Sequence, residues 1–386
     1  MVANINLPKI MKIGAGAIDL LTDILTSIDC HHPCFITDKT MVELGYVDKI
    51  THQLSANQIP FGVFSDTMPE PSEASILGAV KQVKTGGFDC LIALGGGSAI
   101  DSAKAIALLA SHGGKMRDYK VPYQVHLTSL PIIAIPTTAG TGSEATMVTI
   151  ITDAANDEKM LCMGPGLMAT AAIIDYELTL SLPSRVAADT GIDALTHAIE
   201  AYVSRKANLF SDQQAKAAMQ LIAPNLLESI AQPLDIKARE AVMLGATLAG
   251  IAFSNASVAL VHGMSRPIGV HFHVPHGMSN AMLLPAITEY SISSAPLRYA
   301  QCAQFMGLVD DVDNLTAAHT KLISELHKFN RILKVPTLAE FGVEKETFLR
   351  LIPLMAEQAQ GSGSPGNNPR IPSLHEIHQL YQALWV

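Results

Sequence analysis

The stretch FDCLIALGGGSAIDSAKAIALLA, residues 88–110, decides the fold. It begins with an apolar run of strand length, continues through three glycines, and then places apolar residues at helical spacing. Ser98 is positioned to cap the predicted helix. A strand, a glycine turn and a helix in this order direct backbone N–H groups toward a phosphate, although such turns also occur without any ligand. Because the turn is not a G-x-G-x-x-G motif, taken alone it leaves both interpretations open.

The residues around this stretch continue the alternation of strands and helices. Short apolar runs at 34–37, 59–64, 130–135 and 171–175 predict strands, and helical patterns appear at 41–54 and 72–84. The segments TMVTIITD and KMLCM flank the polar residues 153–158 and predict a hairpin. Strands joined by helical crossovers form a parallel sheet that is covered on both faces. The first half of the chain therefore predicts an α/β domain.

Beyond Pro183 the sequence predicts helices and no strand. We expect helices at about 184–204, 211–230, 236–258, 277–291, 296–306, 313–331, 338–358 and 373–384. The boundary divides the chain into an α/β domain, residues 1–183, and an all-helical domain, residues 184–386. Residues 241–261 carry no charge and are long enough to span a bilayer, but they lack an aromatic belt and a basic flank. We expect them to form a buried central helix.

A second polar loop, PTTAGTGSE at residues 136–144, follows another predicted strand. It offers four hydroxyl groups, from Thr137, Thr138, Thr141 and Ser143. Asp38 also ends a strand, where it either accepts hydrogen bonds from a ribose diol or caps the following helix. Sheets of this class bind nucleotides at the carboxyl ends of their strands. The two loops together predict a nucleotide site.

The helical half contains a candidate metal site. Asp193 and His197 are four residues apart, so a helix places them on one face. His262 and His276 follow later and are separated by Pro267, Gly269 and Pro275, too many helix breakers for one continuous helix. One carboxylate and three imidazoles form a ligand set for a divalent metal. A metal beside a dinucleotide predicts hydride transfer, in which the metal acts as a Lewis acid on an alcohol oxygen.

Composition limits the class of protein. The 386 residues are 48% hydrophobic and 16% charged, with a net charge of -9, which disfavours a nucleic-acid or anionic-membrane surface. The five cysteines are scattered and odd in number, as expected for reduced thiols rather than a disulfide framework. The first residues do not resemble a signal peptide. We expect a cytoplasmic protein without a membrane or nucleic-acid partner.

Four motifs together resemble the iron-containing (group III) alcohol dehydrogenases, a family that includes lactaldehyde and propanediol oxidoreductases. They are GGGSAID, PTTAGTGSE, GIDALTHAIEAYV and VHGMSRPIG…PHGMSNAMLLP, and the resemblance covers nearly the whole chain. It implies a Rossmann-like nucleotide domain and an all-helical metal domain, as in the dehydroquinate synthase-like fold, with the active site in the cleft between them. It also implies a homo-oligomer, such as a homodimer.

The resemblance assigns roles to particular residues. It implies that Asp193, His197, His262 and His276 bind Fe²⁺, although zinc suits the same ligands and has the higher intrinsic affinity. It implies that Gly96, Gly97 and Ser98 hold the pyrophosphate. The hydroxyl residues of the second loop, Thr137, Thr138, Thr141 and Ser143, would line the nucleotide cleft. Asp38 would face the adenosine ribose, which favours NAD over NADP, and Lys159 would contact the cofactor or remain solvated.

The chain departs from the family pattern at two positions. Arg266 stands where lactaldehyde reductases carry a histidine four residues after the third ligand, so the proton relay is open, with His271 and His273 as candidate substitutes. An arginine can bind a carboxylate, sulfonate or phosphate, which predicts an anionic aldehyde or hydroxy acid as substrate; alternatively it pairs with an acid of the protein. Glu70 stands where relatives often have asparagine.

The sequence alone is compatible with three functions. The first is an NAD-linked, metal-dependent dehydrogenase for a small primary alcohol or aldehyde, with His262, Arg266 and His276 nearest the chemistry. The second is a metal-dependent lyase resembling dehydroquinate synthase, which recycles bound NAD. The third is a nucleotide-binding module without catalysis, which leaves the Asp/His set unexplained.

Overall fold

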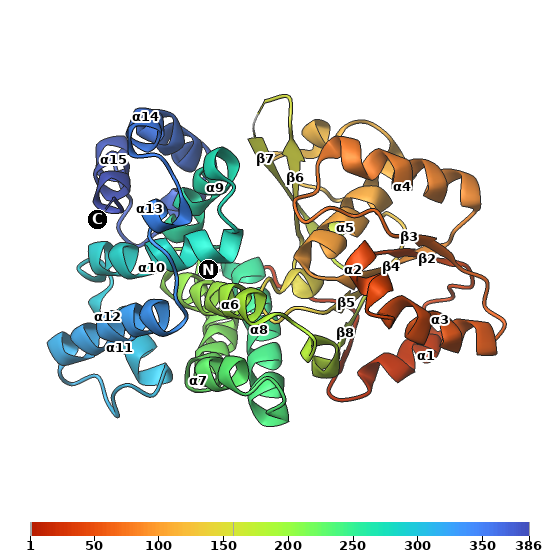
Figure 1. The fold of residues 1–386 in the computed structure, drawn as a ribbon, viewed down its shortest axis with the longest axis horizontal. Helices are drawn as coiled ribbons and strands as arrows, with labels where there is room; N and C mark the ends of the chain where they lie inside the picture. The colour runs from red at the N-terminus through yellow and green to blue at the C-terminus, as the bar shows by residue number, and fades with distance from the viewer. Residues whose placement is uncertain (1, 157, 386) are drawn as a thin grey trace. The chain divides into compact units, whose positions relative to one another are not determined.

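The computed structural model describes residues 2–156 and 158–385, and the chain divides into two compact units. One unit comprises Ile5–Leu182, and the other comprises Pro183–Val386 with Met1–Asn4. The first is an α/β unit and the second is helical, which confirms the predicted fold class (Figure 1).

The α/β unit is built on a six-stranded sheet in which all neighbouring strands are parallel, in the order β1-β8-β5-β4-β2-β3. The strands are β1 Ile10–Ile13, β2 Pro33–Ile36, β3 Gly62–Phe64, β4 Cys90–Gly95, β5 Ile132–Pro136 and β8 Ala171–Ile174. The predicted hairpin forms a separate antiparallel pair, β6 Val148–Asp153 and β7 Glu158–Met163. Strand β1 was not predicted, because this short edge strand is half exposed and shows no alternation of apolar residues.

Successive residues of the central strands enter two different cores. Leu91 and Ala93 of β4 pack with α4 (Glu73–Gly86) and α5 (Gly97–His112), whereas Ile92 and Leu94 face α1 (Leu21–Ser27) and α3 (Tyr46–Ala56). Figure 1 shows these helix pairs on the two faces of the sheet. The continuous apolar runs in the sequence follow from this burial on both faces.

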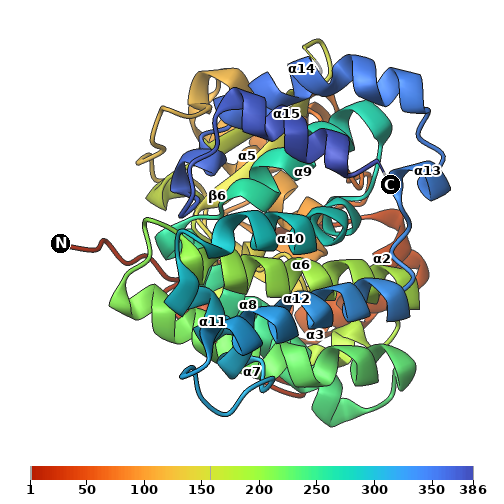
Figure 2. The same ribbon diagram turned by 90° about the vertical axis from the view of Figure 1, so that its left-hand side faces the viewer.

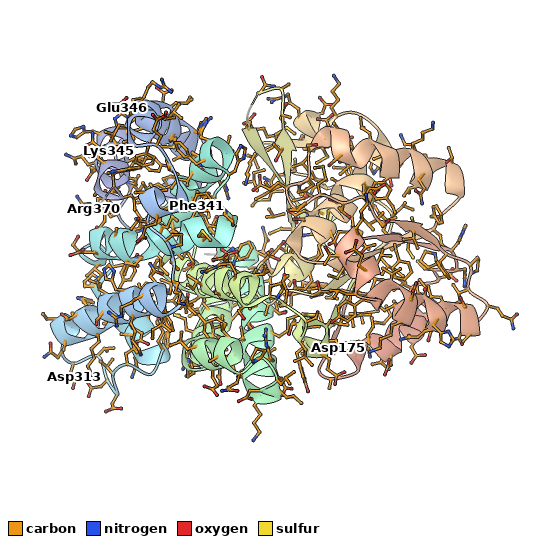
Figure 3. The ribbon with its side chains drawn as sticks, in the orientation of Figure 1. Asp175, Asp313, Phe341, Lys345, Glu346 and Arg370 are labelled. Carbon is orange, nitrogen blue, oxygen red and sulfur yellow. The ribbon has the colours of Figure 1, made fainter. Side chains whose placement is uncertain are left out.

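Short elements hold the ends of the sheet. Helix α2 spans Lys39–Glu43, and single helical turns lie at Ala17–Leu20, Met116–Tyr119, Ser143–Ala145, Pro165–Leu167 and Tyr176–Thr179. Asp175, labelled in Figure 3, follows β8 and accepts hydrogen bonds from the backbone N–H groups of Ile18 and Glu177. The buried carboxylate thus ties the first helical turn to the end of the sheet.

The helical unit is organised around α6, which packs against α7, α8 and α10 (Figure 2). The unit contains α6 Ser184–Val203, α7 Leu209–Ala231, α8 Ile236–Ala256, α9 Leu260–Phe272, α10 His276–Ile292, α11 Pro296–Phe305, α12 Leu315–Ile332, α13 Leu338–Phe341, α14 Lys345–Gly361, a helical turn at Ser364–Asn367, and α15 Leu374–Ala383. Gly191 lets α7 approach closely, since a Cβ there would lie 2.3 Å from Leu226 Cδ1. Among the described residues, no single helix has both the length and the apolar character to cross a membrane; α8 and α9 pass that test only as a pair bent by 104°.

Two helix predictions were wrong in detail. No helix was predicted for α9, Leu260–Phe272, which continues through Pro267 and Gly269 and ends before His273, whose φ of 56° is left-handed; His262 and His276 lie on separate helices, as expected. The segment 338–358 is two helices, because Gly342 adopts a φ of 97° between α13 and α14. In both places a helix ends at a residue with positive φ.

Candidate metal and nucleotide sites

Helix α6 supplies the first two predicted metal ligands. Asp193 and His197 lie one turn apart, with His197 Nε2 3.8 Å from Asp193 Oδ1. The His197 ring stacks on Phe253 of α8, at 4.3 Å between ring centroids. This packing fixes the plane of the imidazole beside the carboxylate.

The other two predicted ligands come from α9 and α10. His262 lies in the first turn of α9, and its Nε2 is 3.5 Å from Asp193 Oδ1. His276 is the first residue of α10, and its Nε2 is 3.9 Å from the same oxygen. The ligand atoms of Asp193, His262 and His276 all lie within 4.8 Å of one another, and His197 stacks on His262 at 4.5 Å. The structure therefore brings the four side chains together around one carboxylate oxygen.

The cluster is buried except at one edge. The side chains of Asp193, His197 and His262 are at most 6% exposed, whereas that of His276 is 34% exposed. Burial would raise the pKa of Asp193, but the imidazoles of His197, His276 and His262 outweigh it and hold the pKa well below its usual range. A carboxylate that stays ionised among three imidazoles provides the charge that a divalent cation requires.

Glu200 is a member of this cluster that the sequence analysis missed. Its buried carboxylate accepts hydrogen bonds from His262 Nδ1 at 2.6 Å and from the backbone N–H groups of Ala259 and Val261 at 2.9 and 2.6 Å. The spacing Asp193, His197, Glu200 places all three on one face of α6, and this was the available signal.

Asn280 is a second missed residue. It lies one turn after His276 on α10, and its Nδ2 donates to Asp193 Oδ1 at 2.6 Å. The same nitrogen is 3.1 Å from His262 Nε2 and 3.3 Å from His276 Nε2, while Asn280 Oδ1 is buried without a hydrogen-bond partner. The amide group therefore lies where the predicted ligand atoms converge.

The donor set fits a divalent metal. Because a carboxylate can only accept, the Glu200 contact places a proton on His262 Nδ1 and leaves Nε2 facing Asp193. Burial lowers the pKa of His262, but hydrogen bonds to Asp193 and Glu200 raise it above its usual value, so the surroundings favour positive charge at this position. Imidazole and carboxylate ligands suit both Fe²⁺ and Zn²⁺.

Arg266 lies one turn after His262 on α9. Its Nη1 donates to Ser364 Oγ at 3.2 Å, and its Nε is buried without a hydrogen-bond partner. Burial lowers the pKa of Arg266 to about 10, and within the described residues only Glu200, already engaged with His262, acts against this shift. His271 contacts Gln358 at 2.8 Å, and His273 is exposed at the end of α9.

The first glycine loop begins α5. Gly96 is the N-cap residue, so the prediction that Ser98 caps this helix was wrong; its hydroxyl donates instead to the carbonyl oxygen of Pro69. A Cβ on Gly96 would lie 3.2 Å from Thr138 Cγ2, and one on Gly97 would lie 2.8 Å from Thr141 Cγ2. The two predicted loops are thus in direct contact, and a Cβ at Gly97 would require Thr141 to move.

Lys104 of α5 binds the end of the second loop and the residues that follow it. The buried Lys104 Nζ donates to oxygen atoms of Ser143, Thr146 and Val148 at 2.8–3.2 Å. Ser143 is itself buried, and its hydroxyl donates to Asp101 at 2.6 Å. Ser143 therefore holds the loop in place rather than lining its surface. In the same loop, the buried hydroxyl of Thr138 has no hydrogen-bond partner.

The remaining predicted nucleotide residues have partners within the unit. Asp38 caps α2 by accepting from Met41 N at 3.0 Å, and its Oδ2 lies 3.5 Å from the position of a Cβ on Gly95. Lys159 on β7 pairs with Glu70 at 2.8 Å, so it is not simply solvated. Thr137 is buried and continues the backbone from β5, with its N–H donating to Gly95 O at 3.0 Å.

A second group of possible ligands lies at the amino ends of β2 and β4. Cys30, Asp89 and Cys90 place their ligand atoms within 4.8 Å of one another. The Asp89 carboxylate already accepts from the backbone N–H groups of His31 and His32, and both thiols belong to an apolar core. We interpret this group as structural packing.

Comparison with known proteins places this geometry in a family. The model described as "Iron-containing alcohol dehydrogenase" matches residues 8–176, and "Fe-containing alcohol dehydrogenase family, C-terminal" matches residues 187–385. The chain is 34% identical over 375 residues to lactaldehyde reductase of Escherichia coli (strain K12), covering 96% of this chain and 97% of that one. It is 33% identical over 380 residues to NAD-dependent methanol dehydrogenase of Bacillus methanolicus, covering 98% of each. A solved structure of a 1,3-propanediol oxidoreductase superposes with a TM-score of 0.94 at 30% identity, covering 100% of both chains. The chain belongs to the iron-containing alcohol dehydrogenase family.

Proposed function

We propose that the protein interconverts a small primary alcohol and its aldehyde, with Fe²⁺ as metal and NAD as hydride acceptor. The observation that carries this proposal is the convergence of Asp193, His197, His262 and His276 in a member of this family. A relative named NAD-dependent methanol dehydrogenase supports NAD. In the forward direction RCH₂OH and NAD⁺ give RCHO, NADH and a proton.

The residues of the chain then have separate roles. A cation held by the four ligands supplies Lewis acidity that lowers the pKa of an alcohol hydroxyl. His276, the exposed member of the cluster, lies at the edge from which substrate arrives. His262 is held in one orientation by Glu200, so it acts as a ligand rather than as a mobile base.

In the α/β unit, the Gly96 and Gly97 backbone and the start of α5 would bind the pyrophosphate, with Thr137, Thr138 and Thr141 alongside. Asp38 lies beside Gly95, where its carboxylate would accept from a ribose diol and repel the 2′-phosphate of NADP. Ser98 and Ser143 support these loops through Pro69 and Asp101 rather than through the cofactor. Lys159 reaches the cofactor once it is released from Glu70.

A substrate panel tests the reaction class. Primary alcohols, 1,2- and 1,3-diols, ω-hydroxy acids and their aldehydes would be assayed with NAD and NADP after loading with Fe²⁺ or Zn²⁺. Net NADH formation from a simple alcohol supports the proposal and excludes a lyase that recycles its NAD. If no alcohol yields NADH with either metal, the dehydrogenase proposal fails.

Arg266 favours a substrate that carries a negative charge. No acid of the described residues neutralises it directly, and its guanidinium retains an unused donor one turn from a metal ligand. A carboxylate or sulfonate on the substrate would complete its hydrogen bonds. Lactaldehyde, named in the description of one relative, is a neutral aldehyde, so the charge preference of this protein is a quantity to measure.

The Arg266 proposal is tested with butanal and 4-oxobutanoate, which differ mainly in the terminal carboxylate. The wild type should prefer the anion, and Arg266→His should reduce that preference in kcat/KM about 10- to 100-fold, the value of one charge-assisted interaction. Arg350→His, at an exposed position on α14, is the control and should leave the ratio unchanged. An unchanged ratio in Arg266→His would remove Arg266 from substrate selection.

The protein is further proposed to be a cytoplasmic homo-oligomer. The five cysteines are all free and buried, in keeping with a reducing compartment. The oligomer rests on family resemblance, and light scattering on purified protein tests it directly.

A further inference from the structure

Glu200 connects α6 to the start of α9 through a single buried carboxylate. Its Oε1 accepts from Val261 N at 2.6 Å, and its Oε2 accepts from Ala259 N at 2.9 Å and from His262 Nδ1 at 2.6 Å. The side chain is 4% exposed. Three donors from residues 259–262 therefore converge on one acidic group.

The backbone before α9 requires such an acceptor. Ser257 has a φ of 90°, and Ala259, the N-cap residue of α9, makes no side-chain capping bond. The first N–H groups of a helix have no partner within the helix, and the two that reach Glu200 are buried with it. Glu200 thus replaces a capping side chain, and the negative charge also suits a helix N-terminus.

The hydrogen bond from His262 to Glu200 determines which ring nitrogen of His262 carries a proton. With a proton held on Nδ1, Nε2 is left facing Asp193 Oδ1 and Asn280 Nδ2, 3.5 and 3.1 Å away. A neutral imidazole binds a metal only through a nitrogen without a proton. Glu200 therefore determines which nitrogen of His262 is available.

We propose that Glu200 is a positioning residue of the metal centre: it caps α9 and fixes the tautomer in which His262 presents Nε2 to the metal. Glu200 touches neither the substrate nor the reacting atoms. The inference rests on the proposed metal function of the cluster. It extends that function, because the carboxylate and the α9 backbone are treated as one unit that preforms the site before metal arrives.

The variant Glu200→Gln tests the proposal with little change in shape. An amide has one oxygen and one NH₂ group, so it cannot accept from all three donors. In one orientation its NH₂ group would face the N–H group of Val261, and in the other it would face those of Ala259 and His262. We expect Fe²⁺ and Zn²⁺ affinities, measured by competition with a coloured chelator, to fall about 10- to 100-fold. Asp189→Asn is the matched control, because Asp189 is a buried acid of α6 that pairs with Arg185. Its metal affinity should match the wild type.

The tautomer is read separately by nitrogen-15 NMR of histidine-labelled, metal-free protein, with His262 assigned from the spectrum of His262→Gln. We expect the wild type to carry the His262 proton on Nδ1 and Glu200→Gln to lose this single state. A wild-type protein without a proton on His262 Nδ1 would overturn the inference even if the variant fails to fold. A folded Glu200→Gln variant that binds metal as tightly as the wild type would also overturn it. If the wild type itself binds no metal, the proposed function fails first, so the two failures are distinct.

Discussion

Single glycines determine how closely the helices around the metal cluster approach one another. Gly277 follows His276 at the start of α10, and a Cβ at this position would lie 2.2 Å from the carbonyl oxygen of Asp189 on α6. The neighbour is backbone and cannot rotate away. Gly277 therefore allows α10 to bring His276 to Asp193.

We expect Gly277→Ala to destabilise the protein by about 1–3 kcal/mol, as for an overpacked core site. Because α10 must shift away from α6, metal affinity should fall as well. Chemical denaturation and chelator competition measure the two effects. Gly361→Ala is the control, since a Cβ there meets nothing within 4 Å at the end of α14. Equal behaviour of the two variants would show that the helices do not depend on this contact.

The pair between Glu70 and Lys159 makes a second prediction for single residues. Glu70 is 46% exposed and Lys159 is 12% exposed, with 2.8 Å between the charged atoms. Glu70→Asn should release the lysine for the cofactor and lower the KM for NAD by about two- to fivefold, the range expected for a surface ion pair. Lys159→Met should raise this KM. If neither variant changes the KM for NAD, Lys159 does not contact the cofactor.

The roles of individual residues were the least predictable from sequence. The spacing of Asp193 and His197 and the two later histidines indicated the cluster, because helix periodicity brings residues four apart onto one face. Glu200 and Asn280 were missed because an acid or an amide on a helix is usually solvated, and only the meeting of α6, α9 and α10 buries them. The cap of α5 was assigned to Ser98, but the N-cap residue is Gly96, two positions earlier.

At the scale of elements, the second polar loop depends on one buried lysine. The three N–H groups of Lys104 Nζ are shared among five oxygen atoms of residues 143–148 within 3.2 Å, and the acids Asp101 and Glu144 lie nearby. The loop contains glycines and lacks a long regular element, so it has little to hold it except this lysine and Asp101. These contacts hold the second polar loop in one conformation next to the first glycine loop.

Lys104→Met should destabilise the protein by roughly 3 kcal/mol, since it leaves buried carbonyl oxygens and an acid without their partner. The KM for NAD should rise because the loop beside Gly97 loosens. Denaturant unfolding and steady-state kinetics report the two results. Lys84→Met, at an exposed position in the last turn of α4, should change stability by less than about 0.5 kcal/mol. A Lys104 variant as stable as this control contradicts the anchoring role.

The C-terminal helix α15 makes a pH-dependent prediction. Glu376 accepts from the backbone N–H of Ser373, from its hydroxyl and from Arg370, labelled in Figure 3. These contacts, with the Ser373 backbone first, lower the pKa of Glu376 to about 2 from 4.5. A group whose pKa is lower in the folded state stabilises fully above its unfolded pKa, and this contribution is lost as pH falls from about 4.5 toward 2.

The comparison of wild type with Glu376→Gln measures this contribution. Their difference in free energy of unfolding should be constant above about pH 5 and shrink as the pH falls below 4.5. Helix α15 also supports α9, because the hydroxyl of the buried Tyr381 donates to Met264 O at 2.7 Å. A difference that does not depend on pH would show that the cap has no electrostatic part.

The elements themselves were largely predictable, and the exceptions have physical reasons. Runs of consecutive apolar residues predicted the central strands, because each of these strands is buried on both faces of the sheet. Strand β1 lacked this signal. Helix α9 was not predicted because Pro267 and Gly269 disfavour a helix, but α9 forms there and packs against α14 and the turn at 364–367. Tertiary contacts override local preference at such places.

For the whole molecule, family, fold class and reaction type agree. The family models match both halves of the chain, and the α/β and helical units correspond to them in order. The net charge of -9 disfavours a nucleic-acid partner, and that expectation stays a prediction. A cation that binds the folded cluster and not the unfolded chain stabilises the protein, by about 2.7 kcal/mol at a hundredfold excess over its Kd.

The central claim is that one divalent cation, bound by Asp193, His197, His262 and His276, is required for alcohol oxidation. Anaerobic titration of metal-free protein with Fe²⁺, followed simultaneously by bound metal and by alcohol-dependent NADH formation, tests it most directly. We predict that activity rises in proportion to bound metal until each chain holds one ion, and that Asp193→Asn neither binds tightly nor turns over. Full activity of the metal-free protein, or tight binding that is unchanged in Asp193→Asn, would contradict the account.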